Sequence, residues 1–512
     1  MKRAHIELAL VLVALVALGG FATRFVNQSG WTLYYGDAEA HLNIARRIVD
    51  SRTPGYEQLG YPWLPLPTVL MLPLVRYDPW WRNGLAGAIP SSACWVLAGV
   101  FLFLAVRRAM RSSAAALVAL GIFALNPNLL YLQATPMLEP VFLAGFMAIL
   151  YFTVLFRDTQ SLFAVLGAGF ASLAASLSRY DGWFLIPFVT LYFLLAARRR
   201  RLVAALIFGA IASLAPIYWL AHNWWLYANP LEFYNGPYSA KGIYQRALDQ
   251  HMPPSPGDHD WKKSWLFFRT TARACAGWGA VLVAAVGLAG VIWKRTFWPL
   301  ALVAIPPAFY LWRMYAGESP IYVPELWFNS YYNTRYGLSV LPLLAIAGAG
   351  VVLLAPNRLR PFFAIAVIAA AVAPWLMHAR PDDWICWKES QVNSEGRRAW
   401  TRQAAQLLAS QYRPGTGIYT SFGDDKVAVL REAGIPLREA LRDANEPAWM
   451  AATTRPDLFL HEEWVLATSG DPVATAVQRA TFRASFKTGP RYYRVQTIIV
   501  HGEPVIEIYK RD

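Results

Sequence analysis

The chain has 512 residues, of which 56% are hydrophobic and only 15% are charged, and its formal net charge is +15. This composition excludes a soluble protein of this size and predicts a polytopic membrane protein. The basic residues fall in short clusters between apolar segments, which is typical of topology signals and excludes nucleic acid as a partner. Cys94, Cys275 and Cys386 show no metal-ligand spacing and allow at most one disulfide. Cys94 lies within a predicted span, which leaves Cys275 and Cys386 as the possible pair. The sequence does not show whether these two cysteines form a disulfide.

Apolar segments of about 17–25 residues are long enough to cross a bilayer as helices. The sequence predicts eleven such spans, which together form a membrane domain over residues 1–377. They lie near 5–25, 84–106, 113–132, 137–156, 161–178, 183–197, 202–221, 276–293, 297–315, 336–354 and 361–377. The proline-rich segment 62–79 is expected to lie on the membrane surface or to re-enter it.

Basic residues predict the orientation of these spans. With Lys2 and Arg3 in the cytoplasm, every short turn on that side is basic, as the positive-inside rule requires. These turns contain Arg107, Arg108 and Arg111, then Arg157, residues 198–201, Lys294 and Arg295, and Arg358 and Arg360. The chain is therefore expected to be a multi-pass protein of the plasma (inner) membrane with its C-terminus outside. The alternative, a signal peptide cleaved near Ala22, would break this alternation.

With this orientation the remaining polar motifs all lie on the outer side. They are Gly36–Glu39, Thr135–Pro140, Ser178–Trp183, the outer loop 222–275 and the segment 318–337. Ionisable residues at membrane level are costly and usually face a protein interior or a water-filled cavity. Several of them at one level predict a single outward-facing polar cavity.

The first outer loop, residues 27–83, contains the most informative stretch. Asp37 and Glu39 stand at its start and open a predicted amphipathic helix over 37–50. The apolar stripe of this helix consists of Leu42, Ala45, Ile48 and Val49. Carboxylates at a membrane surface, followed by a helix lying along it, predict a site built at the interface.

Residues 378–512 have the composition of a soluble domain and are long enough for one. Strands are predicted over 417–422 and 457–461, helices over 424–433 and 472–482, and a closing hairpin over 496–500 and 504–509. This alternation favours a small α/β domain on the extracytoplasmic side. The glycines at 415 and 417 do not form a dinucleotide-binding fingerprint, so no cofactor is assigned to this domain.

At these residues the chain resembles the GT-C type glycosyltransferases, polytopic membrane enzymes that use polyprenyl-phosphate sugar donors. It is most similar to the branch of protein mannosyltransferases and lipid A aminoarabinose transferases. The resemblance covers residues 1–377 and is strongest in the first outer loop, where it implies that Asp37 is the catalytic acid and Glu39 the second acid. Some members have two adjacent acids, whereas one residue separates them here. The Trp-Trp-Asp-Tyr-Gly signature of oligosaccharyltransferases is absent: Trp80-Trp81 and Trp224-Trp225 are not followed by it.

Transfer from such a donor needs a base near the acceptor hydroxyl, and Asp37 is the candidate. Its alternative role is the N-cap of the helix that follows. Glu39 is a candidate for orienting the acceptor or for binding a divalent cation such as Mg²⁺ or Mn²⁺, or else it complements the helix dipole. His41 can share the helix face of Asp37, with a surface or hydrogen-bonding role expected rather than a metal site.

The departing phosphate needs positive charge, for which arginine is well suited. Arg335, beside Tyr336, and Arg179 are the candidates for this substrate-binding role. Interfacial anchoring is the alternative for both arginines. Asp181 is expected to brace Arg179, and Glu139 to orient Asp37 or an arginine.

The sequence thus predicts an inverting glycosyltransferase that moves a sugar from polyprenyl phosphate to a protein, lipid or glycan acceptor outside the membrane. A transporter or flippase is the alternative, but it would show internal repeats and polar groups near the midplane. A second alternative is a non-catalytic membrane anchor for the C-terminal domain. Such an anchor would not need acidic residues where the outer loops leave the membrane. Neither the sugar, the acceptor nor metal dependence can be assigned from the sequence.

Overall fold

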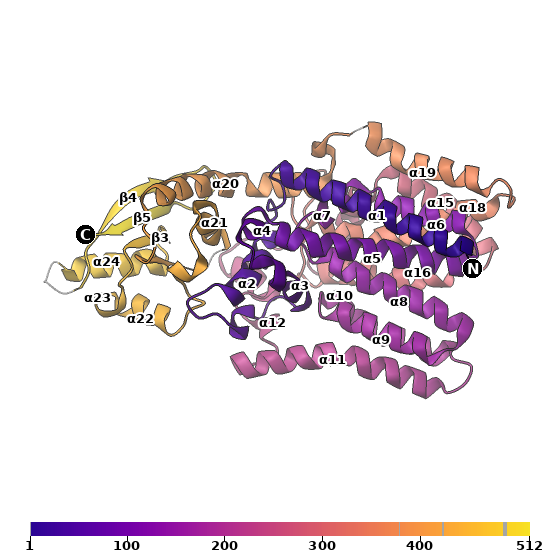
Figure 1. The fold of residues 1–512 in the computed structure, drawn as a ribbon, viewed down its shortest axis with the longest axis horizontal. Helices are drawn as coiled ribbons and strands as arrows, with labels where there is room; N and C mark the ends of the chain where they lie inside the picture. Colours follow the sequence, from indigo (N-terminus) through magenta and orange to yellow (C-terminus); the bar gives the residue numbers. More distant parts are fainter. Residues whose placement is uncertain (1, 378, 422–423, 485–488) are drawn as a thin grey trace. The chain divides into compact units, whose positions relative to one another are not determined.

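Helices dominate the computed structural model of the chain, which describes residues 2–377, 379–421, 424–484 and 489–512 (Figure 1). The chain divides into two compact units, and each is assembled from separate stretches of sequence. The first unit comprises residues 1–29, 61–67 and 88–389, and the second comprises residues 30–60, 68–87 and 390–512. The first outer loop is therefore divided between the two units, which the sequence did not predict.

The first unit consists of long apolar helices and their connections (Figure 1). Its helices are α1 (Lys2–Gln28), α5 (Leu85–Met110), α6 (Ser113–Ala124), α7 (Pro127–Gln133), α8 (Glu139–Thr159), α9 (Leu162–Ser176), α10 (Tyr180–Ala196), α11 (Arg201–Tyr227), α12 (Glu232–Asn235), α13 (Ala240–Asp249), α14 (Trp261–Ala276), α15 (Trp278–Trp293), α16 (Trp298–Val303), α17 (Ile305–Tyr315), α18 (Leu341–Leu354) and α19 (Arg360–Met377). Two short 3₁₀ segments, η2 (Thr334–Val340) and η3 (Pro381–Asp383), belong to the same unit.

All eleven predicted spans are helical, and the chain has the architecture of a polytopic membrane protein. Within the described residues, six helices are long and apolar enough to cross a membrane, or eight if each of two sharply bent helix pairs is one span. The total of eleven crossings stays a prediction.

Two predicted spans are each divided into two helices. The span 113–132 bends by 68° between α6 and α7, where Asn126 caps α7 and Pro127 occupies its first turn. Proline is compatible with the start of a helix but not with its interior. The span 297–315 divides in the same way before Pro306 and Pro307.

Small residues let helices of this unit approach closely. At Gly287 of α15, an added Cβ would lie 2.0 Å from the backbone oxygen of Ala347 in α18. At Gly290, it would lie equally close to the oxygen of Gly350. Helices in lipid associate through such close packing, because lipid tails are as apolar as the side chains.

The second unit is built around a five-stranded sheet in the order β2-β1-β3-β5-β4. Its strands are β1 (Ile418–Thr420), β2 (Ala440–Leu441), β3 (Trp464–Thr468), β4 (Tyr492–Ile498) and β5 (Ile506–Arg511). Strands β2, β1 and β3 run parallel, whereas β5 pairs antiparallel with both β3 and β4. The predicted α/β domain with a closing hairpin is therefore confirmed.

The helices of the second unit come from both ends of the chain. They are α2 (Gly36–Val49), α3 (Leu66–Val75), α4 (Asp78–Asn83), most of α20 (Ile385–Gln411), α21 (Asp424–Ala433), α22 (Ala448–Thr454), α23 (Pro456–Phe459) and α24 (Pro472–Ala484), with the 3₁₀ segments η1 (Tyr56–Leu59) and η4 (Leu437–Glu439). Leu42 and Ala45 of α2 share one buried core with Trp400, Leu430 and Trp464. The apolar stripe predicted on α2 thus packs on the C-terminal domain.

One predicted strand of this domain is wrong. Residues 457–461 fall mostly in the short helix α23, and the strand follows it as β3. Pro456 stands in the first turn of α23, where its fixed φ favours a helical start. The run of Trp464, Val465 and Leu466 carries the stronger β preference and is fully buried.

Candidate active site

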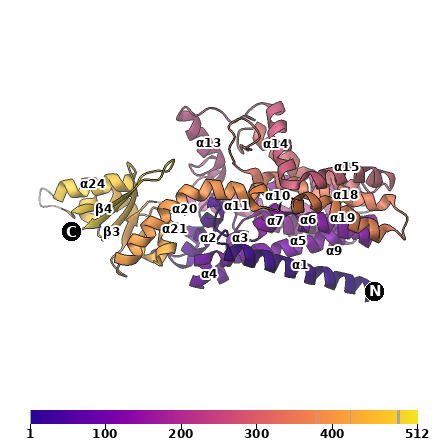
Figure 2. The ribbon, with the colours of Figure 1, turned by 90° about the horizontal axis from the view of Figure 1, so that it is seen from above.

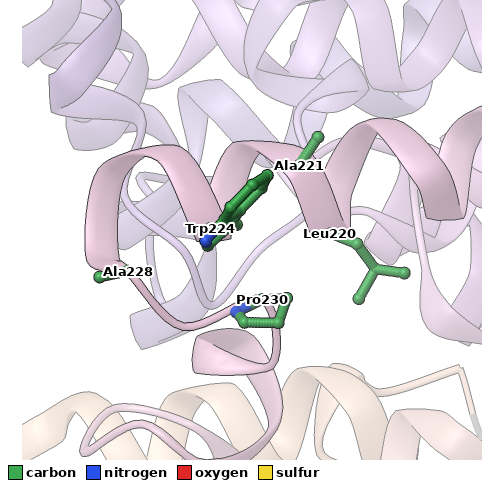
Figure 3. A pocket seen from close by; sticks show the side chains of 5 residues that line it. All are labelled: Leu220, Ala221, Trp224, Ala228 and Pro230. Carbon is green, nitrogen blue, oxygen red and sulfur yellow. The ribbon is translucent and has the colours of Figure 1, made fainter.

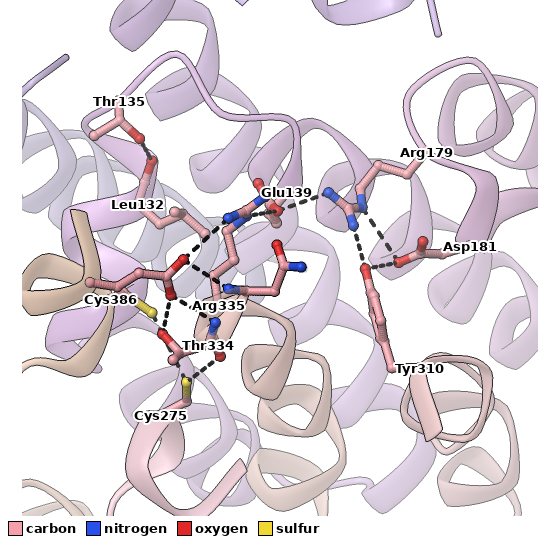
Figure 4. A network of polar contacts seen from close by, with 12 residues as sticks. Leu132, Thr135, Glu139, Arg179, Asp181, Cys275, Tyr310, Thr334, Arg335 and Cys386 are labelled. Carbon is pink, nitrogen blue, oxygen red and sulfur yellow. Dashed lines mark hydrogen bonds and ion pairs between the residues drawn. The ribbon is translucent and has the colours of Figure 1, made fainter. Parts of the chain in front are cut away.

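The first unit contains a buried polar cluster centred on Glu139 (Figure 4). Arg179 donates from Nη1 to Oε1 of Glu139 at 2.8 Å, and Arg335 donates from Nε to the same oxygen at 3.2 Å. Figure 4 shows the Glu139 side chain lying between the two guanidinium groups. Three residues predicted separately from the sequence thus meet at one carboxylate oxygen.

Tyr310 and Asp181 complete the side of the cluster around Arg179. Arg179 Nη2 donates to the Tyr310 hydroxyl, which in turn donates to Asp181 Oδ2 at 2.6 Å. Arg179 Nε lies 3.4 Å from the same oxygen of Asp181, so the two side chains form an ion pair. Tyr336 stacks on Tyr310 at 4.6 Å between ring centroids, and both arginines lie within 6 Å of its ring.

Glu389 closes the other side of the cluster, around Arg335. It accepts hydrogen bonds from the backbone nitrogens of Asn333 and Thr334, at 3.0 and 2.7 Å, and from the Thr334 hydroxyl. Arg335 Nη1 reaches it at 3.5 Å. Burial raises the pKa of Glu389, while Arg335 and these donors oppose that rise. The carboxyl of Glu389 therefore holds Arg335 and its own segment in place.

Local backbone features place these groups. Glu139 lies in the first turn of α8, next to Pro140, where the helix dipole favours a carboxylate. Arg179 is the N-cap of α10 and has an extended backbone. Arg335 follows Asn333, whose φ of 53° turns the chain into η2; asparagine tolerates this left-handed conformation better than most residues.

The cluster contains two cations and three carboxylates, so it is anionic when all of these groups are charged. Glu139 is 8% exposed, and within the described residues its second oxygen, Oε2, is buried without a hydrogen-bond donor. A buried acceptor without a donor is costly.

A second polar centre lies in the other unit, around Glu39. Arg431 Nη2 donates to Oε1 of Glu39 at 2.6 Å, and Arg397 Nη1 pairs with Oε2. Arg431 also exchanges guanidinium-to-carbonyl hydrogen bonds with Arg82, at 2.7 and 2.8 Å. Glu39 is 3% exposed, so this is a buried ion triad.

Asp37 and His41 lie on the same helix as Glu39. Helix α2 begins at Gly36, and Tyr35 is its N-cap without a side-chain capping bond. The alternative role of Asp37 as N-cap is therefore wrong, because Asp37 lies in the first turn and is partly exposed. His41 is buried rather than at the surface.

The predicted residues are thus divided between the two units. Glu139, Arg179, Asp181, Arg335 and Tyr336 meet in the first unit, whereas Asp37, Glu39 and His41 lie on α2 in the second. The residues that sequence analysis missed are Tyr310, Glu389, Arg397 and Arg431. Tyr310 is one of 25 tyrosines, and the other three lie beyond the predicted end of the membrane domain, so no motif singled them out.

The donor set at Glu39 does not fit a divalent cation. Both of its oxygens are bound by guanidinium groups. Across the described ranges, no group of three or more His, Cys, Asp or Glu side chains is arranged to hold a metal ion.

An open, apolar hollow of about 350 Å³ lies at the end of α11 (Figure 3). It is lined by Leu220, Ala221, Trp224, Ala228 and Pro230. Figure 3 shows the Trp224 ring standing beside this hollow. None of the predicted site residues lines it.

The fold is similar to that of solved GT-C glycosyltransferase structures. ArnT, the aminoarabinose transferase from Cupriavidus metallidurans, matches with a TM-score of 0.52 in its complex with undecaprenyl phosphate, at 14% identity over 95% of this chain and 97% of ArnT. Apo ArnT matches with the same score and coverage at 15% identity. The apo oligosaccharyltransferase of Archaeoglobus fulgidus matches with a TM-score of 0.48 at 14% identity over 90% of this chain and 69% of its own. No protein-family model and no curated protein sequence matches the chain.

Proposed function

We propose that this protein transfers a glycosyl group from a polyprenyl-phosphate donor to an acceptor hydroxyl or amine on the extracytoplasmic face of the membrane. The observation that carries the proposal is the buried arginine pair bridged by Glu139 in a helical membrane unit. Charged groups in such surroundings usually serve a function. The fold shared with ArnT, whose structure contains undecaprenyl phosphate, supports the same conclusion.

The reaction is a single displacement at the anomeric carbon. The acceptor oxygen or nitrogen forms the new bond to this carbon while its bond to the phosphate oxygen breaks, which inverts the anomeric configuration. The resemblance of the first outer loop to that of the GT-C enzymes makes Asp37 the proposed base for the acceptor proton. Polyprenyl phosphate leaves with one more negative charge than it carried in the donor. Asp37 suits this role because it is partly exposed, whereas Glu39 is bound by two arginines.

Arg179 and Arg335 are the groups proposed to stabilise the leaving phosphate. Their guanidinium groups now contact Glu139, Asp181 and Glu389, so a phosphate competes with these carboxylates for the same donors. Glu139 keeps the arginines together through one oxygen. Its other oxygen, to which no described residue donates, is proposed to accept a hydrogen bond from a hydroxyl of the substrate.

No step is assigned to a metal ion, because the oxygens of Glu39 are already bound to arginine. We propose that the reaction takes place on the outer side of the plasma membrane, because the turns expected on the inner side are basic. The identity of the sugar depends on contacts with individual hydroxyl groups, so the substrate is proposed only as the class of polyprenyl-phosphate sugars.

The test is glycosyl transfer by the purified protein in lipid, with a panel of radiolabelled polyprenyl-phosphate sugars and a membrane extract as acceptor source. Asp37→Asn is compared with Asp249→Asn, the same change on the exposed helix α13. We expect transfer by the wild type and the control, and none by Asp37→Asn although it still binds donor. Full activity of Asp37→Asn would remove Asp37 from the mechanism. Donor binding without transfer under every condition would favour a flippase.

A further inference from the structure

Helices α14 and α15 meet at a right angle. The bend between them is 101°, and it occurs at Gly277, whose φ is 84°. An added Cβ at Gly277 would lie 2.7 Å from the Trp375 ring, so both conformation and space require glycine. Figure 2 shows α13 and α14 standing out from the long helices of the same unit.

Helix α15 has the features of a short membrane span. It is apolar throughout, begins with Trp278, ends with Trp293, and is followed by Lys294 and Arg295. Its 16 residues correspond to about 24 Å, and tryptophan is enriched at both membrane–water interfaces. Trp278 therefore marks an interface. Helix α14 joins α15 beside this residue at a right angle, which is the geometry of a helix that lies along a membrane surface.

The two faces of α14 differ in chemistry. Ser264, Phe267, Phe268, Thr271 and Cys275 are buried. A neighbouring face exposes Trp261, Trp265 and Arg269, which are spaced four residues apart, together with Lys262. Trp265 is 53% exposed. This face combines large aromatic rings with cations, as interfacial helices do.

The charge of α14 is entirely positive. It contains Lys262, Lys263, Arg269 and Arg273 and no acidic residue. Lys263 lies 3.6 Å from Asp260, and Arg273 pairs with Glu325. In the part of the chain that the structure describes, Lys262 and Arg269 have no carboxylate partner. Two exposed cations next to an exposed tryptophan are complementary to the phosphate groups of a lipid surface.

We propose that α14 is a membrane-surface helix that binds anionic phospholipid headgroups. Trp265 inserts its ring at the level of the glycerol groups, and Lys262 and Arg269 contact the lipid phosphates. This contact holds the loop 222–275 against the bilayer, whether or not the protein is a glycosyltransferase. Each basic residue near an anionic surface is expected to strengthen the attraction about fivefold.

The test is hydrogen–deuterium exchange of the full chain in nanodiscs of phosphatidylcholine, with and without phosphatidylglycerol. The variant Lys262→Gln/Arg269→Gln is compared with Arg413→Gln/Arg479→Gln, which removes two exposed cations from the C-terminal domain. We expect phosphatidylglycerol to slow exchange of the α14 amides in the wild type and the control. In the α14 variant this slowing is lost, and peptides from α24 respond in none of the proteins.

A salt titration of the wild type gives a second measurement that does not depend on a variant. Because headgroup binding is electrostatic, high salt is expected to abolish the slowing. Equal exchange of α14 in both kinds of nanodisc would overturn the proposal. It would also be overturned if the α14 variant kept its response to phosphatidylglycerol, or if an acidic protein protected α14 while the lipid did not.

Discussion

Arg431 donates a hydrogen bond of 2.6 Å to Glu39, although 392 residues separate the two in sequence. Arg397 occupies the second oxygen of the same carboxylate. All three side chains are buried, so the ion triad ties helix α2 to helices α20 and α21 within the second unit. The helix that carries the proposed base is therefore positioned by the C-terminal domain.

Replacing Arg431 by glutamine is expected to destabilise this unit strongly. The change leaves Glu39 buried with one cation instead of two, and breaking a buried ion pair costs roughly 3–5 kcal/mol. Thermal unfolding of the full chain measures the effect. Arg438→Gln is the matched control, because Arg438 pairs with the buried Asp50 at 3.0 Å but is itself 63% exposed, and water screens the charge of an exposed partner. If both variants lost the same stability, the buried ion pair would contribute no more than the partly exposed one.

Replacing Glu139 by glutamine is expected to reduce glycosyl transfer about 100-fold. The shape of the side chain is kept, but the charge that holds Arg179 and Arg335 together is lost. Initial rates over a range of donor concentrations separate the effect on kcat from that on KM. Glu325→Gln, an exposed partner of Arg273, is expected to leave both unchanged. A normal rate in Glu139→Gln would exclude Glu139 from the site.

Cys275 and Cys386 are expected to resist alkylation until the protein unfolds. Their sulfurs lie 4.0 Å apart, and both residues are fully buried. Burial raises the pKa of the Cys386 thiol well above its usual range, with a further contribution from Cys275. The thiol is therefore neutral and unreactive at neutral pH. Mass spectrometry after treatment with iodoacetamide, with and without denaturant, counts the modified cysteines; fast labelling of both in the folded protein would contradict this environment.

Asp457 is expected to make stability depend on acid pH. Hydrogen bonds from Arg455 and Arg483 lower its pKa from 3.8 to about 2. Because the folded pKa lies below the unfolded one, its contribution is complete above the unfolded value and is lost as the pH falls toward 2. Thermal unfolding of the wild type and Asp457→Asn between these limits measures the contribution. The variant should lack this part of the pH dependence, and identical profiles would show that the ion pairs contribute nothing.

The sequence predicted the helices well because their signal is local. Apolar segments and the stripe on α2 follow from composition and periodicity alone. The residues that cover this stripe are distant in sequence. Leu42 and Ala45 pack in one core with Trp400 and Leu430, which lie near the other end of the chain. The strand predicted at 457–461 is wrong for a local reason. Pro456 favours the start of a helix, and this preference outweighs the strand-like sequence that follows it.

The candidate site was predicted only in part, because contacts between residues distant in sequence leave no local pattern. Glu139, Arg179 and Arg335 were found because charged residues are conspicuous beside apolar segments. Tyr310 was not conspicuous among many aromatic residues, and Glu389 lies past the last predicted span. The partners of Glu39, Arg397 and Arg431, are ordinary basic residues of a soluble domain, and only the three-dimensional structure shows which carboxylate they bind.

Glycosyl transfer from a polyprenyl-phosphate donor is tested most directly by a stoichiometric measurement in a single turnover. The purified protein in proteoliposomes receives a polyprenyl-phosphate sugar labelled in both the sugar and the phosphate, together with an acceptor. We expect one polyprenyl phosphate to be released for each sugar joined to the acceptor, with inverted anomeric configuration. Intact donor that has crossed the bilayer, with no sugar on the acceptor, would contradict the proposed glycosyl transfer.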